Sequence, residues 1–312
     1  MIIISSLETD VADHCNLKCK HCAHHSPYLS RSFYSVSEFE KDIKSASAVL
    51  HSEWFKVIGG EPLLNKDLFQ YIEIIKKYNI SDNIAIFTNG ILLDRVGDNV
   101  LDSINVLSVS EYPLTPILNE KIKSNILNVR KSYPNLTVIH NYYDTFDAQE
   151  FTKKNDDGQL VKKIWDRCKL RFECNTIYRG YFSKCIVARR KRDFLLEANC
   201  VEDYDALNTL ESDNCNLHTP NLRERFLKYY FSDTPLDTCK WCVGSCGKSV
   251  PHRQNTDRHI EHNTISDVID VDAINKPSLI TQDRYPHVSP ITRQPKYSTI
   301  VDSDGIHHVK KT

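Results

Sequence analysis

The chain has 312 residues, of which 40% are hydrophobic and 26% are charged, with a formal net charge of −1. This composition is typical of a globular protein, and the near-zero charge gives no general bias toward nucleic acid or a membrane surface. No apolar run reaches the roughly 18 residues of a membrane span. The N-terminus, MIIISSLETD, lacks the basic start and long apolar core of a signal peptide. We therefore expect a cytoplasmic protein that does not bind a membrane.

The eleven cysteines are unevenly distributed, with none between residues 23 and 167 or after 246. A disulfide-stabilised secreted protein would be short and would carry a secretion signal, and neither holds for this chain. Clustered cysteines in a reducing compartment more often bind metal or take part in catalysis. The cysteines are Cys15, Cys19, Cys22, Cys168, Cys174, Cys185, Cys200, Cys215, Cys239, Cys242 and Cys246.

Residues 1–150 alternate apolar, strand-like runs with amphipathic helical runs. Repeated βα units predict parallel strands with crossover helices, and hence an α/β sheet or partial barrel. Ser35 and Glu38 form a capping-box signature at the start of the first helix, which we expect to continue to about Leu50. The expected strands are Ile2–Leu7, Trp54–Ile58, Asn83–Thr88, Ile104–Ser110 and Leu136–Tyr143, and further helices are expected over Asp67–Tyr78 and Asn119–Tyr133.

Polar or glycine-rich segments follow the first four of these strands. Because chemistry in parallel sheets concentrates at the carboxyl ends of the strands, we expect these segments to form one site. They are the cysteine loop at 15–22, Gly59-Gly60, Asn89-Gly90 and the region of Ser110.

The remainder of the chain has a less regular pattern. Residues 151–250 hold the other cysteines, and Ile177–Cys185 predicts a hairpin that turns at Gly180. Residues 251–312 are polar and predict a weakly structured tail or an extension lying over the domain. The histidines of this last region lack metal-ligand spacing, and we expect them at the surface: His252, His259, His262, His307 and His308.

The cysteine loop, CNLKCKHC, places three thiols at the spacing C-x3-C-x2-C. A structural zinc ion takes four protein ligands, and a nearby imidazole could supply the fourth. Three thiolates around a four-iron cluster would instead leave one iron open to another molecule, whereas four thiolates close a cluster. The candidate imidazoles for the zinc alternative are His14, His21, His24 and His25.

The loop together with the following GGEP segment, Gly59–Pro62, resembles the radical S-adenosylmethionine (SAM) superfamily. The resemblance implies a partial (βα)6-type barrel in which Cys15, Cys19 and Cys22 hold a catalytic 4Fe–4S cluster. It also implies that Gly59, Gly60, Glu61 and Pro62 contact the amino group of the SAM methionine moiety. The chemistry is consistent, because glycines allow close backbone approach, and backbone carbonyls and a carboxylate accept hydrogen bonds from an ammonium group.

Two later strand ends extend this resemblance. FTNG, with Thr88 and Asn89, and SVSEYP, with Ser108 and Ser110, are similar to segments that face the SAM ribose or the substrate in the family. Ser108 and Ser110 have the same parity on their strand, so both can point into the barrel. The residue before the third cysteine is often aromatic in the family and packs on adenine. Here His21 holds that position, and its imidazole is the candidate adenine contact.

The second cysteine group resembles the twitch and SPASM modules that follow some radical SAM domains. Cys168, Gly180 and Cys185 have the spacing C-x11-G-x4-C, and a C-x2-C pair, Cys239 and Cys242, follows. The short cysteine set favours the one-cluster twitch form, in which four thiolates ligate a second 4Fe–4S cluster. Cys174 could replace Cys168, Cys246 could replace Cys242, and a zinc knuckle remains the alternative. Cys200 and Cys215 are interpreted as bystanders.

Arg189, Arg190, Lys191 and Arg192 follow the predicted hairpin in the run ARRKRDF. We interpret them as a solvated positive edge, with a clamp for an anionic substrate group or an RNA contact as the alternatives. Four positive charges in a near-neutral chain are too few to argue for nucleic-acid binding.

The resemblance implies the following organisation: a radical SAM core at 1–150, whose end could extend further, a twitch-like module at 151–250 and a polar extension at 251–312. It implies reductive cleavage of SAM to a 5′-deoxyadenosyl radical that abstracts hydrogen from a small polar, sugar- or aminocyclitol-like substrate, which could be anionic. The second cluster would support oxidation, dehydration or epimerisation, and a flavodoxin- or ferredoxin-like protein would donate electrons.

The alternatives are a peptide maturase, a tRNA-modifying enzyme and a non-catalytic zinc module. The first strand begins within a few residues of Met1, which leaves no room for the N-terminal peptide-binding domain common in peptide maturases.

Overall fold

A computed structural model of the protein describes residues 1–200, 202, 213–256, 260–275, 297–301 and 307–311. The predicted α/β architecture is confirmed: five parallel strands are joined by crossover segments in the order β5-β4-β3-β2-β1. The strands are β1 (Ile2–Asp10), β2 (Leu50–Ile58), β3 (Ser81–Thr88), β4 (Val106–Glu111) and β5 (Thr137–Tyr142).

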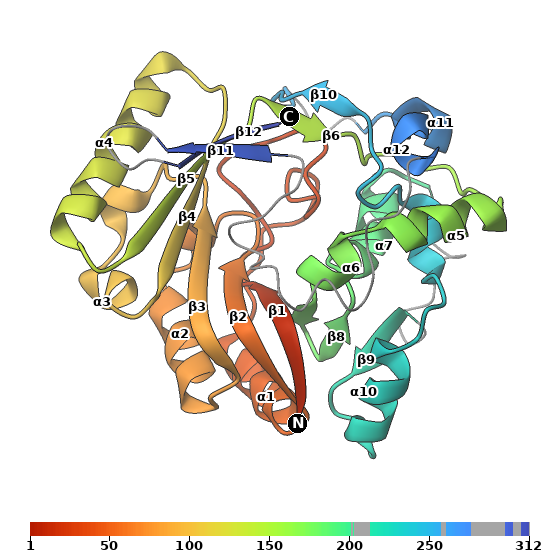
Figure 1. Ribbon diagram of the computed structural model, residues 1–312, viewed down its shortest axis with the longest axis horizontal. Helices are drawn as coiled ribbons and strands as arrows, with labels where there is room; N and C mark the ends of the chain where they lie inside the picture. Colours follow the sequence, from red (N-terminus) through yellow and green to blue (C-terminus); the bar gives the residue numbers. More distant parts are fainter. Residues whose placement is uncertain (201, 203–212, 257–259, 276–296, 302–306, 312) are drawn as a thin grey trace.

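The helices of the first half cover one face of this sheet (Figure 1). Figure 1 also shows that the ends of β1–β4 that carry the predicted site lie together on the side away from the N-terminus. The helices are α1 (Val36–Ser47), α2 (Leu68–Lys77), α3 (Asp98–Leu101) and α4 (Pro116–Ser132), with short 3-10 turns η1 (Pro62–Leu64) and η2 (Leu93–Arg95) between them.

Several local predictions differ from the structure. The first helix ends at Ser47 rather than near Leu50, because β2 already begins at Leu50, which pairs with Ile2 of β1. β1 continues to Asp10 rather than Leu7, because the last residues of β1 pair with Lys56–Ile58 of β2 even though their side chains are polar. The predicted capping box does not form: Ser35 is the residue before α1, but its hydroxyl contacts the Ser37 hydroxyl at 2.9 Å instead of a backbone N–H.

The predicted hairpin is confirmed, and it extends the same sheet. β7 (Thr176–Tyr178) pairs in parallel with β1, and β8 (Tyr181–Ser183) and β9 (Asn214–Asn216) follow in antiparallel order. The turn between β7 and β8 requires positive φ at both Arg179 (φ 45°) and Gly180 (φ 84°). Eight strands of the described residues therefore form one sheet, and the region after residue 150 supplies three of them.

The remaining elements lie mostly beyond the β7–β9 end of the sheet (Figure 1). Two short strands, β6 (Thr145–Asp147) and β10 (Ser249–Pro251), pair antiparallel and bring residues near 146 and 250 together. β11 (Tyr297–Val301) and β12 (His307–Lys311) form another antiparallel pair. The helices are α5 (Gly158–Arg167), α6 (Leu170–Glu173), α7 (Val187–Glu197), α10 (Leu222–Tyr230), η3 (Asp237–Trp241), α11 (Ile265–Val268) and α12 (Val271–Asn275).

The basic run on α7 is buried, which the sequence interpretation did not anticipate. Arg190 is 2% exposed and Lys191 is 1% exposed. Arg190 donates to Asp10 at 2.8 Å and to Asp13 at 2.6 Å, and the Lys191 ammonium lies over the rings of Phe151 and Phe194. The prediction of a solvated positive edge is therefore wrong for these two residues, because buried acidic partners from the start of the chain and two aromatic rings surround them.

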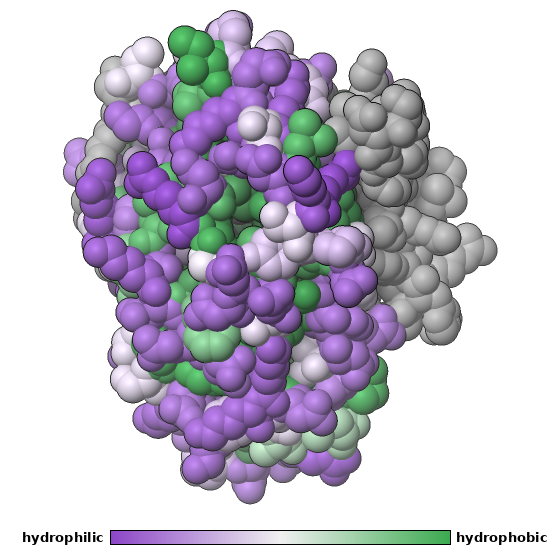
Figure 2. Space-filling view, turned by 90° about the vertical axis from the view of Figure 1, so that its left-hand side faces the viewer, coloured by the Kyte–Doolittle hydropathy of each residue, from purple (hydrophilic) through white to green (hydrophobic). Residues whose placement is uncertain are grey.

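The outer surface on the α4 side is mostly hydrophilic, with hydrophobic residues scattered over it (Figure 2). Ile117 and Leu127 of α4 are among the exposed large hydrophobic residues. Among the described residues, no helix has both the length and the apolar character needed to span a bilayer.

Candidate active site

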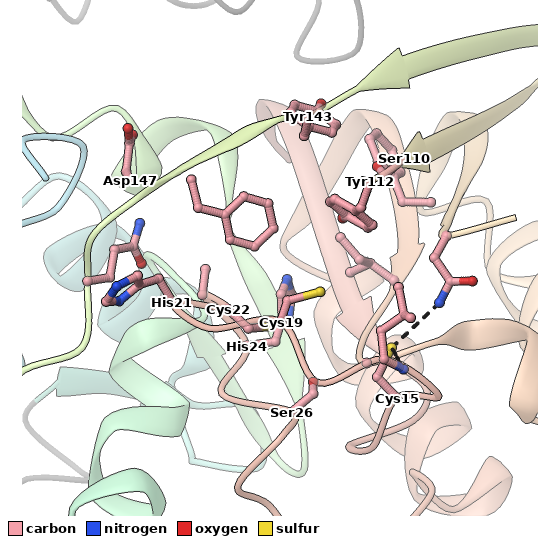
Figure 3. Close-up of a pocket in the computed structure, with 18 of the residues that line it drawn as sticks. Cys15, Cys19, His21, Cys22, His24, Ser26, Ser110, Tyr112, Tyr143 and Asp147 are labelled. Atoms are coloured by element: carbon pink, nitrogen blue, oxygen red, sulfur yellow. Dashed lines mark hydrogen bonds between the residues drawn. The ribbon is translucent and has the colours of Figure 1, made fainter. Parts of the chain in front are cut away.

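A cavity of about 340 Å³ lies where the ends of β1–β4 meet. The cysteine loop forms one side, with Ser110, Tyr112 and Tyr143 across from it (Figure 3). The predicted convergence of the strand ends is confirmed. The predicted residues that line the cavity are Cys15, Cys19, His21, Cys22, Gly59, Gly60, Thr88, Asn89 and Ser110.

Each thiol of the cysteine loop faces nearby N–H donors. The Cys15 thiol contacts the Leu17 backbone N–H at 3.3 Å and the Asn89 side-chain amide at 3.6 Å. Cys19 contacts the Gln254 side-chain amide at 3.2 Å, and the backbone N–H groups of Ser26 and His24 face Cys22. Burial raises the pKa of all three thiols, that of Cys19 to about 12. A thiolate here therefore needs a cation to bind it, and this donor set fits a thiolate-ligated iron–sulfur cluster.

Gly59 and Gly60 hold the cysteine loop against β2. A Cβ atom on Gly60 would lie 2.1 Å from the His14 carbonyl oxygen, and one on Gly59 would lie 2.4 Å from that of Ala12. Gly59 also has φ of 140°. Backbone hydrogen bonds from Gly60 N to Ala12 O (2.8 Å) and from Glu61 N to His14 O (3.0 Å) close this contact. The glycines are thus required for the approach of two backbone segments as well as for access to the cavity.

Glu61 and Pro62 do not line the cavity in this structure. The Glu61 carboxylate is fully buried and accepts hydrogen bonds from Leu63 N (3.0 Å), Thr88 Oγ1 (2.7 Å) and Asn89 N (2.8 Å). Burial raises its pKa to about 7, although these three hydrogen bonds oppose the shift. The side chain therefore joins the end of β2 to the end of β3.

The two serines of β4 have different surroundings. Ser110 lines the cavity, whereas Ser108 is buried and accepts a hydrogen bond from the Asn141 amide at 3.2 Å. Asn89 lines the cavity and donates to Asn16 at 2.6 Å, which couples the end of β3 to the cysteine loop.

His21 lies on the cavity wall, toward the same end of the cavity as Asp147 (Figure 3). Its backbone adopts a positive φ of 63°, and its N–H donates to the buried Glu150 carboxylate at 2.6 Å. Burial lowers the pKa of the imidazole to about 4. A neutral, flat ring at this position is compatible with stacking.

The structure adds cavity residues that the sequence interpretation did not identify. An aromatic wall consists of Phe87, Tyr112, Tyr143 and Phe146, and polar or charged side chains occupy another part of the lining: Asp147, Gln149, Lys169, Glu173 and Ser245. Tyr112 is the residue with a sequence signal, because it belongs to the SVSEYP segment. Phe87 likewise belongs to the FTNG segment. Tyr143 is the last residue of the predicted fifth strand, and the remaining residues follow that strand and belong to no motif.

A buried ionic network lies directly behind the cysteine loop. The Asp10 carboxylate forms an ion pair with the Arg190 guanidinium and also contacts the His24 ring at 3.0 Å. His24 lines the cavity. Burial alone would raise the pKa of Asp10, but His24 and Arg190 outweigh it and lower this pKa to about 2. The network joins β1, the cysteine loop and α7.

A second, smaller cavity of about 20 Å³ is lined by four cysteines, Cys168, Cys185, Cys239 and Cys242. These are the four thiols of the predicted auxiliary site, and burial raises the pKa of each. Cys174, Cys200, Cys215 and Cys246 are not among the residues lining it. As the described side chains stand, no group of three or more His, Cys, Asp or Glu is arranged to hold a single metal ion.

The profile of the Radical SAM superfamily matches residues 10–142. Among curated relatives, the probable GTP 3′,8-cyclase of Methanocaldococcus jannaschii is 36% identical over 120 residues, which is 38% of this chain and 40% of the relative. The GTP 3′,8-cyclase of Synechocystis is 29% identical over 168 residues, 48% of this chain and 51% of the relative. The chain thus spans about half or less of the length of these relatives.

Solved structures also resemble the chain. A tagged form of anSMEcpe with bound AdoMet covers 77% of this chain and 82% of its own, with 13% identity and a TM-score of 0.46. BtrN in complex with AdoMet and 2-DOIA covers 77% and 92%, with 15% identity and a TM-score of 0.42. The matched residues 10–142 include the cysteine loop and the ends of β2, β3 and β4 around the cavity. Residues 10–142 of the chain therefore form a radical SAM domain.

Proposed function

We propose that this enzyme cleaves SAM in the 340 Å³ cavity and uses the resulting 5′-deoxyadenosyl radical to abstract hydrogen from a small polar substrate. The observation that carries this proposal is the composition of the cavity. It joins the three-thiol loop to a wall that holds the charged side chains of Asp147, Lys169 and Glu173. These three residues lie outside the matched radical SAM region, where substrate specificity can differ between members.

In the SAM half of the cavity, Cys15, Cys19 and Cys22 would hold the cluster. When bound, a 4Fe–4S cluster with one open iron supplies the electron that cleaves the sulfonium C–S bond. Gly59 and Gly60 offer backbone to the methionine moiety, and Thr88, Asn89 and Ser110 offer hydrogen-bonding groups to the ribose or the substrate. His21 would pack on adenine. Glu61 would not contact SAM directly, but its buried carboxylate would hold the ends of β2 and β3 in place.

In the substrate half, side chains of both charge signs favour a molecule with several hydroxyl, amino or acidic groups. We infer a sugar- or aminocyclitol-like substrate, and Lys169 is the residue that would receive an anionic group on it. The aromatic wall would exclude water from the reacting carbon and limit side reactions of the radical.

The second four-cysteine cavity would hold an auxiliary 4Fe–4S cluster of the twitch type. Four thiolates would ligate it fully, so its function would be electron transfer or structural support rather than SAM binding. With an electron acceptor near the substrate, the net reaction is an oxidation; a dehydration or an epimerisation needs no net acceptor. The same donor set suits zinc, and the metal content distinguishes the two.

We propose a cytoplasmic enzyme whose partners are the small substrate and an external flavodoxin- or ferredoxin-like electron donor. The test begins with iron, sulfide and zinc content of anaerobically reconstituted protein. About eight irons per chain support two 4Fe–4S clusters, about four support the SAM cluster alone, and zinc without iron contradicts the assignment.

The second stage measures 5′-deoxyadenosine formed from SAM with candidate substrates deuterated at ring carbons. Deuterium transfer from a sugar or aminocyclitol into 5′-deoxyadenosine supports the proposed substrate class. Transfer from GTP or from a peptide, with none from sugars, would replace that class by a nucleotide or by the substrate of a peptide maturase.

A further inference from the structure

The segment His252–Asn255, here called the strap, pairs with the cysteine loop although more than 200 residues separate them in the chain. The Lys20 N–H donates to the Arg253 carbonyl at 2.9 Å, and the Asn255 N–H donates to the Lys18 carbonyl at 2.7 Å. Gln254 forms an antiparallel bridge with Cys19 between these two bonds. The strap therefore lies directly against the middle cysteine of the loop.

The Gln254 side chain is oriented by all of its neighbours. Its Oε1 accepts a hydrogen bond from the Lys18 backbone N–H at 2.6 Å. Because a backbone N–H can only donate, the amide oxygen must face Lys18 and the NH2 group must face the other way. There Nε2 lies 3.2 Å from Cys19 Sγ and 3.3 Å from His252 Nε2.

His252 can accept the remaining Gln254 N–H because it is neutral. Its ring is buried, stacks on Tyr112 at a centroid distance of 4.8 Å, and has a pKa that burial lowers to about 4. This contradicts the prediction that His252 is a surface residue; His262 is exposed, and His259 and the side chains of His307 and His308 lie outside the described residues. Both N–H groups and the oxygen of the Gln254 amide are thus used.

We propose that Gln254 is a positioning residue that raises the reduction potential of the cluster bound at Cys15, Cys19 and Cys22. An N–H donor stabilises a thiolate ligand more strongly when the cluster carries the added electron, because negative charge on the sulfur is then greater. Removing the donor makes reduction less favourable. This inference rests on the proposed function, since it requires a cluster at these three cysteines.

The test compares wild type with Gln254→Met and Gln254→Glu by redox titration followed by electron paramagnetic resonance. The relevant signal is the one absent from a variant with Cys15, Cys19 and Cys22 replaced by alanine. Gln254→Met removes the donor without adding charge. We expect the reduced-to-oxidised ratio at a fixed potential to fall about tenfold, equivalent to about 59 mV for one electron.

Gln254→Glu keeps the acceptor for Lys18 N but places a carboxylate at the sulfur, so we expect a larger fall. Asn255→Asp is the matched control, because it adds the same charge one residue along the strap, where Asn255 contacts Tyr28 rather than a cysteine. The reduced-to-oxidised ratio of Asn255→Asp should change less than the ratio of either Gln254 variant.

An unchanged ratio in Gln254→Met overturns the proposal, and so does an equal shift in Asn255→Asp and Gln254→Glu. If Gln254→Met fails to load iron, the comparison of Gln254→Glu with Asn255→Asp decides. Failure of the proposed function is a different result: wild-type protein would then show no cluster signal that depends on Cys15, Cys19 and Cys22.

Discussion

Glu61 and Thr88 tie the ends of two neighbouring strands together, because the Thr88 hydroxyl donates a 2.7 Å hydrogen bond to the Glu61 carboxylate. The same carboxylate accepts a hydrogen bond from the Asn89 backbone N–H. The Asn89 side chain in turn donates to Asn16 in the cysteine loop. A buried acidic side chain thus connects β2, β3 and the cysteine loop without lining the cavity.

The raised pKa of Glu61, about 7 against an ordinary 4.5, predicts a specific pH dependence of stability. Between these two values the folded protein binds a proton that the unfolded chain has released. The contribution of this group to stability is therefore greatest below pH 4.5 and falls as pH rises through 7, by up to about 3 kcal/mol at roughly 1.4 kcal/mol per pKa unit.

Glu61→Gln should flatten this slope, because an amide does not ionise. It should also lower stability at acid pH by losing the hydrogen bond from one backbone N–H. Denaturant unfolding of the metal-free protein across this pH window measures both effects. Glu73→Gln, at an exposed position, is the control and should keep the wild-type slope. If the stability of Glu61→Gln depended on pH as steeply as that of wild type, the Glu61 carboxyl of wild type would not have the raised pKa.

Gly60→Ala should displace the cysteine loop, because the added Cβ would lie 2.1 Å from the His14 carbonyl oxygen and 2.9 Å from the Cys15 nitrogen. We expect loss of iron from the SAM cluster and a fall of at least roughly tenfold in SAM cleavage, since a misplaced ligand loop cannot hold the metal. Gly158→Ala is the matched control, since a Cβ there meets nothing within 4 Å. Normal iron content in Gly60→Ala would mean that the two backbone segments can separate without affecting the site.

Replacing Cys15, Cys19 and Cys22 together by alanine should abolish 5′-deoxyadenosine formation and remove about half of the iron. The reason is that the other four thiols line a separate cavity. Product analysis by chromatography and iron determination on the same preparation test this. Continued 5′-deoxyadenosine formation would contradict the assignment of the SAM site.

Replacing Cys239 and Cys242 by alanine should remove the other half of the iron while the SAM-dependent spectral change persists. Cys200→Ala is the control, because Cys200 does not line the second cavity, and its iron content should equal that of wild type. If the double variant retains all its iron, the second cavity does not hold a cluster. Loss of zinc rather than iron would identify a zinc knuckle.

Arg190→Met should destabilise the protein by about 3–5 kcal/mol, since it removes the buried cation that contacts two buried carboxylates. Asp10 then keeps only His24 as a partner of opposite charge, and Asp13 keeps only the partly exposed Arg179. Arg190 contacts both Asp10 and Asp13 and is 2% exposed. Lys76→Met, which removes an exposed pair with Glu73, should change stability by less than about 1 kcal/mol. Similar denaturation midpoints for the two variants would show that the buried network contributes no more than a surface pair.

Short-range patterns were sufficient to predict the parallel strands of the first half and the cavity at the strand ends. The spacing of Cys15, Cys19 and Cys22 and the Gly59-Gly60 pair carry their information within a few residues, and the alternation of strands and helices defines which ends meet. Cys168, Cys185, Cys239 and Cys242 were also grouped by their spacing, and the structure gathers these four thiols around one cavity.

The tertiary structure alone decided which distant residues complete the site. Nothing near Gln254 in the sequence signals its contact with Cys19, and the polar composition of residues 251–312 predicted only a weakly structured tail or an extension lying over the domain. The basic run at Arg190 and Lys191 predicts exposed side chains, because charged side chains are normally solvated unless they are paired. Here the partners of Arg190, Asp10 and Asp13, lie 180 and 177 residues earlier in the chain. Such pairings depend on how the chain returns to itself, which local residue patterns do not encode.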